Sequence, residues 1–403
     1  MHDRTRGEET GQQSRHLDHT WHFPGRPADP IRVSFHPRGP QVVVTGQVPQ
    51  PATASPAARI DPRPGPYTLL SGLAVAVLLV AVVGVTVGPV RLPVSQILGA
   101  LGARLGLGSG DVDPIVSSIV LQLRLPRVIL ATLVGAALAT SGAIFQGLFR
   151  NPMADPYIIG VSAGAALGAT GAIVFGVTFA AAGLSAATVF AFVGAVAVTA
   201  IVYRLGWHRG DVVIEQLLLA GVAIGAFLGA VISAMQVLGG ESLQQVLFWL
   251  LGGFSGRRWE HVLLILPYVV VGYIVAAAGA RDLNLMVLGD ETARSLGVAT
   301  GRVRIQLTAA GALMAAAAVA TSGLIGFVGL IVPHLLRLVT GPDHRRLLPA
   351  VALGGAVTML LADTLARTLA APREIPVGIV TAGAGAPFFL YLLTKQRKRR
   401  FWS

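Results

Sequence analysis

The sequence contains no cysteine and few charged residues. Without cysteine, the chain cannot form a disulfide, use a thiolate in catalysis or hold a metal ion through sulfur. Charged residues make up 12% of the sequence, whereas soluble proteins carry about 25%. In a chain of 403 residues that is 53% hydrophobic, so little charge cannot cover the apolar surface in water. The composition predicts an integral membrane protein and excludes a series of soluble domains.

Patterns for catalysis and nucleotide binding are also missing. The sequence has no GxxxxGK[ST] phosphate loop, so it does not bind ATP by that route. It has no clustered nucleophile, base or metal-ligand set, which argues against an intramembrane enzyme. In a membrane protein, a net charge of +12 is explained first by basic residues that lie on one side of the membrane, and not by binding of nucleic acid. We therefore predict no catalytic residue, no metal ion, no cofactor on this chain and no nucleic-acid partner.

Residues 1–66 differ from the rest of the chain because they are rich in proline and have no sustained apolar period. Such a segment cannot bury enough apolar surface to offset the entropy of ordering it. We predict a disordered N-terminal tail and no signal peptide, because the first long apolar run begins at Tyr67. The tail histidines could bind a metal ion, but without cysteine or a fixed spacing we favour a solvated extension; they include His16, His19, His22 and His36.

From Tyr67 onward, apolar stretches alternate with short polar breaks. A helix needs about 20 residues to cross the hydrocarbon core, and ten stretches reach roughly that length. We predict an all-α polytopic membrane protein with a permease domain at 67–396, although the Ser322-Gly323 break leaves nine or eleven spans open. The predicted spans are 67–88, 128–149, 158–178, 184–203, 214–238, 261–280, 303–321, 324–340, 347–369 and 375–394.

The distribution of Lys and Arg predicts the orientation in the membrane. With ten spans, both termini lie on one side. Placing that side in the cytoplasm puts most basic residues of the permease domain in inner loops and in the basic C-terminal segment 397–403. The positive-inside rule therefore favours an orientation with both termini in the cytoplasm.

Two spans carry glycine at every fourth position. Gly160, Gly164 and Gly168 form one stripe, and Gly221, Gly225 and Gly229 form the other. Small residues at this spacing allow helix backbones to approach closely in lipid. We expect one stripe to serve packing within the chain, while the other could face a pathway or a second subunit.

Charged side chains are nearly absent from the middle of the predicted spans. A proton- or sodium-coupled carrier usually has acidic residues there, because a charge inside the membrane is retained only for function. Asp363 lies four residues before Arg367, so we favour a local ion pair over an ion-binding role. The energy source must then be a partner or a gradient.

One inner loop has the pattern of a short capped helix, Leu288 to Gly297 with the sequence LGDETARSLG. We predict Asp290 as the N-cap, Glu291 near the positive helix end, Arg294 in the last turn and Gly297 as a left-handed stop. Ala293 and Leu296 would share one side. Such a helix could fit a cytoplasmic cleft, although a helix lying on the membrane surface fits the pattern equally well.

The motifs spread along residues 67–396 together resemble one family, the permease subunits of ABC importers that take up iron-siderophore complexes, haem or cobalamin. The long N-terminal tail is not part of this resemblance. In addition to the inner loop, the motifs are RLPR (Arg124–Arg127), SGAIFQ (Ser141–Gln146), NPMADP (Asn151–Pro156), GVSAGA (Gly160–Ala165), GFVGLIVPH (Gly326–His334) and PVGIVT (Pro376–Thr381).

The resemblance implies the fold of a type II ABC importer permease, with ten spans, a dimer whose pathway follows the two-fold axis, and two cytoplasmic ATPase subunits that bind ATP and Mg. It identifies Gly289 to Gly297 as the helix that couples to the ATPase. Ile214, Glu215 and Gln216 would belong to the cytoplasmic gate, where the family more often has small hydroxyl residues. The Gly221 stripe would lie near the axis.

The resemblance also implies that Arg124, Arg127 and Arg367 face acidic residues of an extracytoplasmic substrate-binding protein. Guanidinium groups pair with carboxylates through two parallel hydrogen bonds, and such pairs at a rim steer and orient docking. The alternative is that Arg124 and Arg127 anchor a helix end at the lipid headgroups. In the context of the motifs, we favour docking.

The leading hypothesis is a permease subunit of an ATP-driven importer in the cytoplasmic membrane of a prokaryote. Two such subunits, in the simplest case a homodimer of this chain, would enclose one pathway. An iron-siderophore complex is the preferred cargo, followed by haem or cobalamin. The alternative is a gradient-driven secondary transporter that acts without ATPase subunits.

Overall fold

The computed structural model describes residues 19–20, 32–34, 43–45, 66–88, 92–104, 106, 113–208 and 211–400. The chain divides into two units, 1–62 and 63–403. In the first unit, three short strands pair antiparallel in sequence order: β1 (His19–Thr20), β2 (Arg32–Ser34) and β3 (Val43–Thr45). Pro66, the last residue of the predicted tail, is the first residue of α1, and apart from the three strands the other residues of the tail lie outside the described part of the chain.

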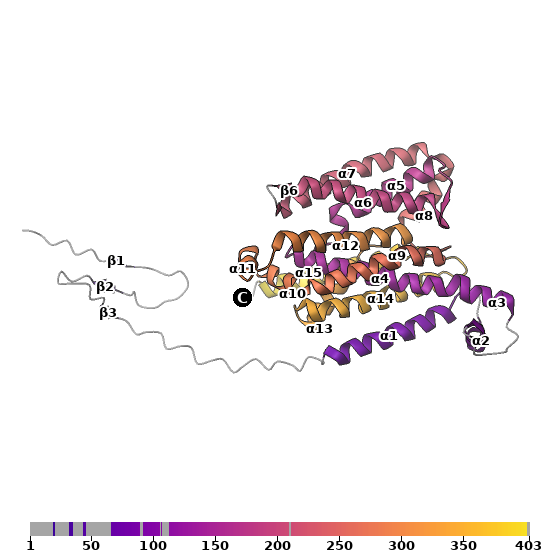
Figure 1. The fold of residues 1–403 in the computed structure, drawn as a ribbon, viewed down its shortest axis with the longest axis horizontal. Helices are drawn as coiled ribbons and strands as arrows, with labels where there is room; N and C mark the ends of the chain where they lie inside the picture. The colour runs from indigo at the N-terminus through magenta and orange to yellow at the C-terminus, as the bar shows by residue number, and fades with distance from the viewer. Residues whose placement is uncertain are drawn as a thin grey trace, which may run out of the picture. The chain divides into compact units, whose positions relative to one another are not determined.

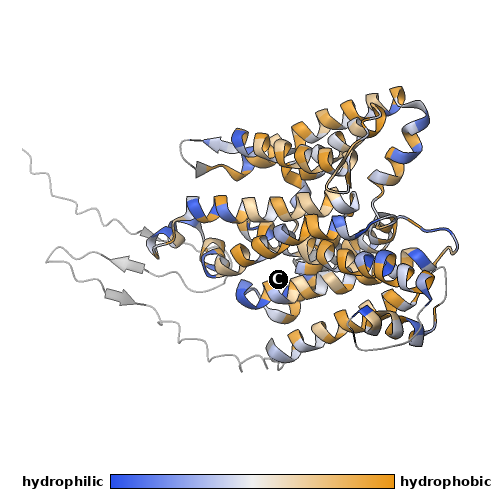
Figure 2. Ribbon diagram, turned by 45° about the vertical axis from the view of Figure 1, so that its right-hand side comes forward, coloured by the Kyte–Doolittle hydropathy of each residue, from blue (hydrophilic) through white to orange (hydrophobic). Residues whose placement is uncertain are grey.

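The second unit is a bundle of helices, and the described residues include seven long apolar helices and three shorter ones. The prediction of an all-helical polytopic membrane protein with ten spans is confirmed. Apolar residues run along the helices, and polar ones gather toward their ends (Figure 2). The long helices are α1 (Pro66–Thr86), α4 (Leu125–Leu148), α6 (Ala186–Gly206), α7 (Ile214–Leu238), α9 (Trp259–Ala278), α12 (Thr300–Ser322) and α14 (His344–Thr368). The shorter apolar segments lie in α5 (Val161–Val174), α13 (Val328–Thr340) and α15 (Val377–Arg400).

Several short elements connect the spans at the two ends of the bundle. The α2, α3 and α8 helices lie at one end, while α11 and β6 lie at the other (Figure 1). The connecting helices are α2 (Val94–Arg104), α3 (Pro114–Ser118), η1 (Ile119–Arg124), η2 (Pro156–Ile159), η3 (Gly240–Ser242), α8 (Leu243–Leu250), α10 (Ala280–Val287) and α11 (Asp290–Ser295). Two small hairpins pair β4 (Ala180–Ala181) with β5 (Leu184–Ser185), and β6 (Trp207–His208) with β7 (Asp211–Val212).

The second span begins earlier than the sequence predicts. The hydropathy pattern places its start at residue 128, but helical structure runs without a break from Pro114 to Leu148. The π-helix η1 ends at Arg124, two residues before Pro126. Because proline has no backbone N–H, it cannot make the usual bond one turn back, and a π-turn accommodates this irregularity.

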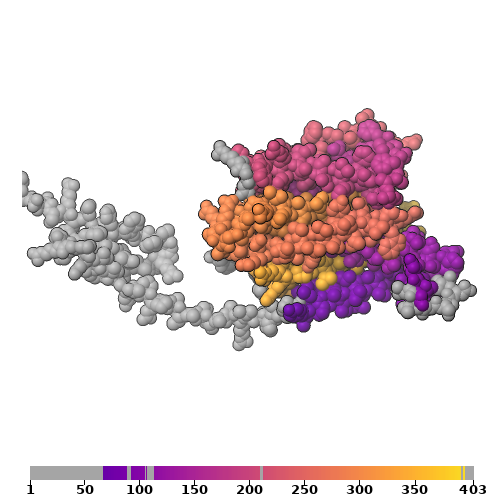
Figure 3. Space-filling view, in the orientation of Figure 1, coloured from indigo at the N-terminus to yellow at the C-terminus, as the bar shows by residue number. Residues whose placement is uncertain are grey.

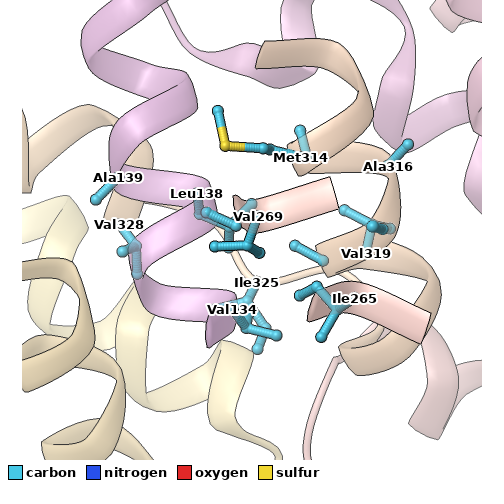
Figure 4. Packing of buried hydrophobic residues seen from close by; sticks show 14 of the residues in the cluster. Val134, Leu138, Ala139, Ile265, Val269, Met314, Ala316, Val319, Ile325 and Val328 are labelled. Atoms are coloured by element: carbon cyan, nitrogen blue, oxygen red, sulfur yellow. The ribbon is translucent and has the colours of Figure 1, made fainter. Parts of the chain in front are cut away.

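The core of the bundle forms around α4 and α12. In each, 78% of the most apolar stretch of 18 residues is buried within the chain. Figure 4 shows Val134 and Leu138 of α4 packing near Ile265 of α9 and Val319 of α12. In the space-filling view, α1 (indigo) lies along one side of the bundle, and α5 to α7 form the opposite side (Figure 3). Only 11% of the corresponding stretch of α1 is buried, as expected of a helix that faces lipid.

Two segments inside the bundle that depart from the α-helix explain why α5 and α13 are short. One precedes α5 and the other joins α12 to α13. They meet where the Tyr157 hydroxyl donates a hydrogen bond of 2.9 Å to the Ile325 carbonyl oxygen. The Gln146 amide donates to the Leu330 carbonyl oxygen at 3.1 Å. Irregular backbone is tolerated within a membrane protein when its polar groups find partners in this way.

The first glycine stripe serves packing within the chain. A methyl group at Gly164 would overlap the carbonyl oxygen of Gly194, and one at Gly168 would overlap that of Phe190. Both partners belong to α6, so α5 and α6 approach until their backbones touch. This outcome agrees with the expectation that one of the two stripes is ordinary intramembrane packing.

Candidate functional site

The predicted coupling loop folds as the short helix α11 between two glycines. Gly289 precedes it with φ +119°, and Gly297 follows it with φ +86°. The left-handed stop at Gly297 is therefore confirmed. The prediction that Asp290 caps the helix is wrong, because Asp290 is the first helical residue, after Gly289. Its carboxylate instead accepts a hydrogen bond of 2.6 Å from Arg304 of α12.

The faces of α11 also differ from the prediction that Ala293 and Leu296 share one side. Ala293 is fully buried, whereas Leu296 is 59% exposed. Glu291 is exposed as well, and the guanidinium of Arg294 donates to the Thr300 hydroxyl at 3.0 Å. The helix is therefore fixed to the bundle by Ala293 and Asp290 and presents Leu296 outward.

An ion-pair network connects α11 to two long helices. Besides Arg304 of α12, Asp290 lies 3.9 Å from the guanidinium of Arg150, which follows α4. Arg304 is nearly buried and also donates to the Val212 carbonyl oxygen at 3.5 Å. Sequence reasoning missed Arg150 and Arg304, because no local spacing links them to Asp290. Through Asp290, α11 therefore contacts the segment that follows α4 and the helix α12.

The predicted gate residues form the first turn of α7, at the end of the bundle where α11 lies (Figure 1). Ile214 is half-buried, while Glu215 and Gln216 are exposed. They adjoin the β6–β7 hairpin, which Arg304 holds through Val212. The structure thus places the predicted gate next to the Asp290 network.

The second glycine stripe divides between two environments. A methyl group at Gly221 would overlap the Ile158 carbonyl oxygen, so Gly221 packs against η2 within the chain. Gly221 was predicted to line the pathway or to pack in the dimer. Its contact with η2 within the same chain does not agree with that prediction. At Gly225 and Gly229, no atom of the described residues lies within 4 Å of the position that a methyl group would occupy. Phe227, which points to another side of α7, is 67% exposed.

The three arginines predicted to dock a binding protein all have partners inside the chain. Arg124 donates to the Val85 carbonyl oxygen at 2.7 Å, and Arg367 donates to the Gly84 carbonyl oxygen at 3.0 Å. Both are nearly buried. They fasten α1 to η1 and α14, so this structure does not present them to a docking surface.

Arg127 lies at the centre of a charge cluster. Its guanidinium pairs with Asp363 at 2.8 Å and with Glu374 at 3.0 Å. Asp363 also pairs with Arg367 at 3.2 Å, which confirms the predicted local ion pair. Asp363 is 1% exposed, whereas Glu374 is 28% exposed. The cluster therefore has a buried side at Asp363 and a rim side at Glu374.

Glu374 is held as a carboxylate on this rim. Burial alone would raise its pKa, but a hydrogen bond from the Ser255 hydroxyl and the charge of Arg127 outweigh burial and lower the pKa below the usual value.

Among the residues that the structure describes, no group of three or more His, Asp or Glu side chains could hold a metal ion.

Comparisons with known proteins identify relatives along most of the chain. The FecCD transport family model matches residues 74–395. The chain is 48% identical over 281 residues to the cobalamin import system permease protein BtuC of Halobacterium salinarum, covering 70% of this chain and 74% of that protein. It is 46% identical over 289 residues to the hemin transport system permease protein HmuU of Yersinia pestis, covering 70% and 84%.

Two further matches extend these findings. The Fe(3+)-citrate import system permease protein YfmD of Bacillus subtilis is 40% identical over 310 residues, covering 74% of this chain and 91% of that protein. A solved structure, an inward-facing conformation of a metal-chelate type ABC transporter, is 33% identical with a TM-score of 0.71. That match covers 82% of this chain and 99% of the solved chain.

Proposed function

The chain belongs to the FecCD transport family, and from this membership we propose that it forms the pathway for a ferric chelate, with an iron-siderophore complex as the preferred cargo. It is a permease subunit of an ABC importer for metal chelates and is not itself catalytic. The observation that carries the importer assignment is the family match over residues 74–395. The short helix α11, which Asp290 joins to Arg150 and Arg304, presents Leu296 for contact with an ATPase subunit. Fe(3+)-citrate relatives support a ferric cargo, while the haem and cobalamin relatives keep those cargos as the alternatives.

A cargo experiment tests this proposal. Vesicles containing the complete importer, with its binding protein and ATPase subunits, are supplied with ATP and one radiolabelled cargo at a time. We expect the ferric siderophore to enter faster than haem or cobalamin at equal concentration. Faster uptake of haem or cobalamin would replace the cargo assignment and leave the permease assignment unchanged.

We propose that two cytoplasmic ATPase subunits, which bind ATP and Mg, engage α11 from the cytoplasm of a prokaryotic cell. Both termini of the chain would then lie in the cytoplasm. Ile214, Glu215 and Gln216 would then lie at the inner mouth of the pathway. The Asp290 contacts with Arg150 and Arg304 support a mechanical role for α11, because they connect it to the core helices.

A second permease subunit, in the simplest case another copy of this chain, would pair through the exposed face of α7. Only 22% of the most apolar stretch of 18 residues in α7 is buried within the chain. Gly225 and Gly229 lie about one turn apart on the same side of α7, and no described part of the chain fills the space beside them. Small residues on an outward face suit close helix contact in a membrane, which supports α7 over α1 as the element that meets the second subunit.

The substrate-binding protein would dock at the opposite end of the bundle, near Arg127. Arg124 and Arg367 bind backbone carbonyl groups of α1 and its end, so they contribute by holding the docking surface in shape. Arg127 could contact the binding protein by exchanging the rim carboxylate of Glu374 for an acidic side chain of that protein. Such an exchange retains one carboxylate on each side of the guanidinium.

A further inference from the structure

A polar cavity of about 390 Å³ lies beside the Arg127 cluster and is not explained by the roles above. It is formed by α8, the segment 252–257 that follows it and the start of α15. This is the end of the bundle that carries α2 and α3 (Figure 1). The volume falls near the small end of the range of about 300–1,000 Å³ for small-molecule sites. Its polar lining includes Arg127, Gln245, Trp249, Ser255, Arg257 and Glu374.

Two hydrogen-bond donors in the cavity wall are buried and have no partner among the residues that the structure describes. They are the indole N–H of Trp249 and the Nε–H of Arg257. Buried donors in proteins nearly always have an acceptor, because leaving one unpaired costs free energy. Both residues belong to the lining of one cavity, so a ligand with acceptor oxygens could satisfy both.

The charges of the lining favour an anion. Arg127 and Glu374 compensate each other at 3.0 Å. The described side chains include no acidic partner within ion-pair distance of Arg257; its Nη1 lies 3.2 Å from Nε2 of His261. Burial lowers the pKa of Arg257 to about 10, which keeps the guanidinium charged near neutral pH. The cavity therefore carries one uncompensated positive charge.

The same wall already shows how a carboxylate is bound. Both oxygens of Glu374 accept hydrogen bonds from Nη1 of Arg127 at 3.0 Å, and Glu374 also accepts one from the Ser255 hydroxyl. A guanidinium with a neighbouring neutral donor is thus a carboxylate site in this protein. Arg257 and Trp249 likewise contribute a guanidinium and a neutral donor to the lining of this cavity, and the described residues supply no acceptor for the Nε–H of Arg257 or the indole N–H of Trp249.

We infer that this cavity binds a carboxylate group of a small anionic molecule, with Arg257 and Trp249 as its principal donors. If the proposed function holds, the carboxylate belongs to the cargo, and the permease itself distinguishes anionic chelates from neutral ones. The cavity accommodates one small carboxylic acid or one arm of a larger chelate. Gln245 supplies a further polar contact in the lining.

Citrate binding to the purified full-length chain tests this inference without transport. Calorimetric titration at fixed ionic strength compares citrate with glycerol, which has no carboxylate. We expect citrate to bind saturably and glycerol not to bind. Arg257→Gln and Trp249→Phe should each weaken citrate about tenfold or more, because each removes a donor from a buried site, while Arg257→Lys should retain part of the affinity.

The adjacent Arg258 provides the matched control, because it is exposed and lies outside the cavity lining. Arg258→Gln removes the same charge and should leave citrate affinity unchanged. Thermal unfolding of each variant identifies any misfolded protein, and Arg257→Lys and Trp249→Phe remain informative if Arg257→Gln does not fold. Equal losses in Arg257→Gln and Arg258→Gln, or no citrate binding by the unmodified chain, would overturn the inference.

The citrate-binding experiment and the cargo experiment test different claims, so either one can fail without the other. If citrate binds through Arg257 but ferric chelates are not imported, the carboxylate site stands and the cargo assignment is wrong. If ferric chelates are imported but citrate affinity does not depend on Arg257 and Trp249, the proposed function stands and the carboxylate site is wrong.

Discussion

Replacing Leu296 with aspartate will weaken binding of the ATPase subunits by about 30-fold or more. Leu296 is 59% exposed on α11, whereas Ala293 and Asp290 hold that helix to the bundle. An apolar anchor of an interface typically contributes about 2 kcal/mol or more, and a carboxylate in the same cleft adds a desolvation cost. The affinity between the purified permease and the ATPase subunits measures this effect.

Leu296→Met is the matched control because it retains an apolar side chain of similar size. It should bind the ATPase nearly as well as the unmodified chain. Because Leu296 makes little contact with the bundle, both variants should unfold at the temperature of the unmodified chain. Normal ATPase binding by Leu296→Asp would show that α11 does not enter the ATPase cleft through this residue.

The second large effect is expected at Asp363, where asparagine will lower the free energy of unfolding by about 3–5 kcal/mol. Asp363 is 1% exposed and lies between Arg127 and Arg367. Removing its charge leaves two guanidinium groups close together without the anion that separates them. Equilibrium unfolding in detergent, followed by loss of helical signal, measures the change.

Glu374→Gln removes the same charge from the rim of the same cluster. Glu374 is 28% exposed, and an ion pair with that much access to solvent contributes about 0–1 kcal/mol. We therefore expect a much smaller loss than for Asp363→Asn. Equal losses in the two variants would contradict the division into a buried and a rim carboxylate.

The spans could be predicted from the sequence because hydropathy over about 20 residues reports directly on insertion into lipid. The predicted break at Ser322-Gly323 is confirmed, since α12 ends at Ser322 and Gly323 has φ +72°. The short helices α2, α8 and α10 were missed. They have 11, 8 and 8 residues, too few to produce a spanning signal.

Side-chain partners could be predicted only where they are local. Asp363 and Arg367 are one helical turn apart, and their ion pair followed from that spacing. Arg127 and Asp363 are separated by 236 residues, so no pattern in the sequence connects them. For this reason the sequence indicated arginines at the surface, whereas the fold brings carboxylates and carbonyl oxygens to them.

In the coupling loop, too, the sequence predicts local features but not the contacts that the fold creates. Its glycines determine where the helix begins and ends, and Gly297 has the predicted left-handed conformation. The capping rule for Asp290 failed because Arg304, which comes fourteen residues later, binds its carboxylate in the fold. The role of α11 in coupling stays a prediction that the Leu296 variants test.

The energy source for uptake gives the most direct test of the proposed function. Vesicles are prepared with the permease alone or with the complete importer, and labelled ferric chelate is supplied either under an imposed ion gradient or with ionophores that abolish ion gradients. We expect uptake against a concentration gradient only by the complete importer with ATP, and it should be unaffected by the ionophores. Uphill uptake by the permease alone under an imposed ion gradient would contradict this function and identify a secondary transporter.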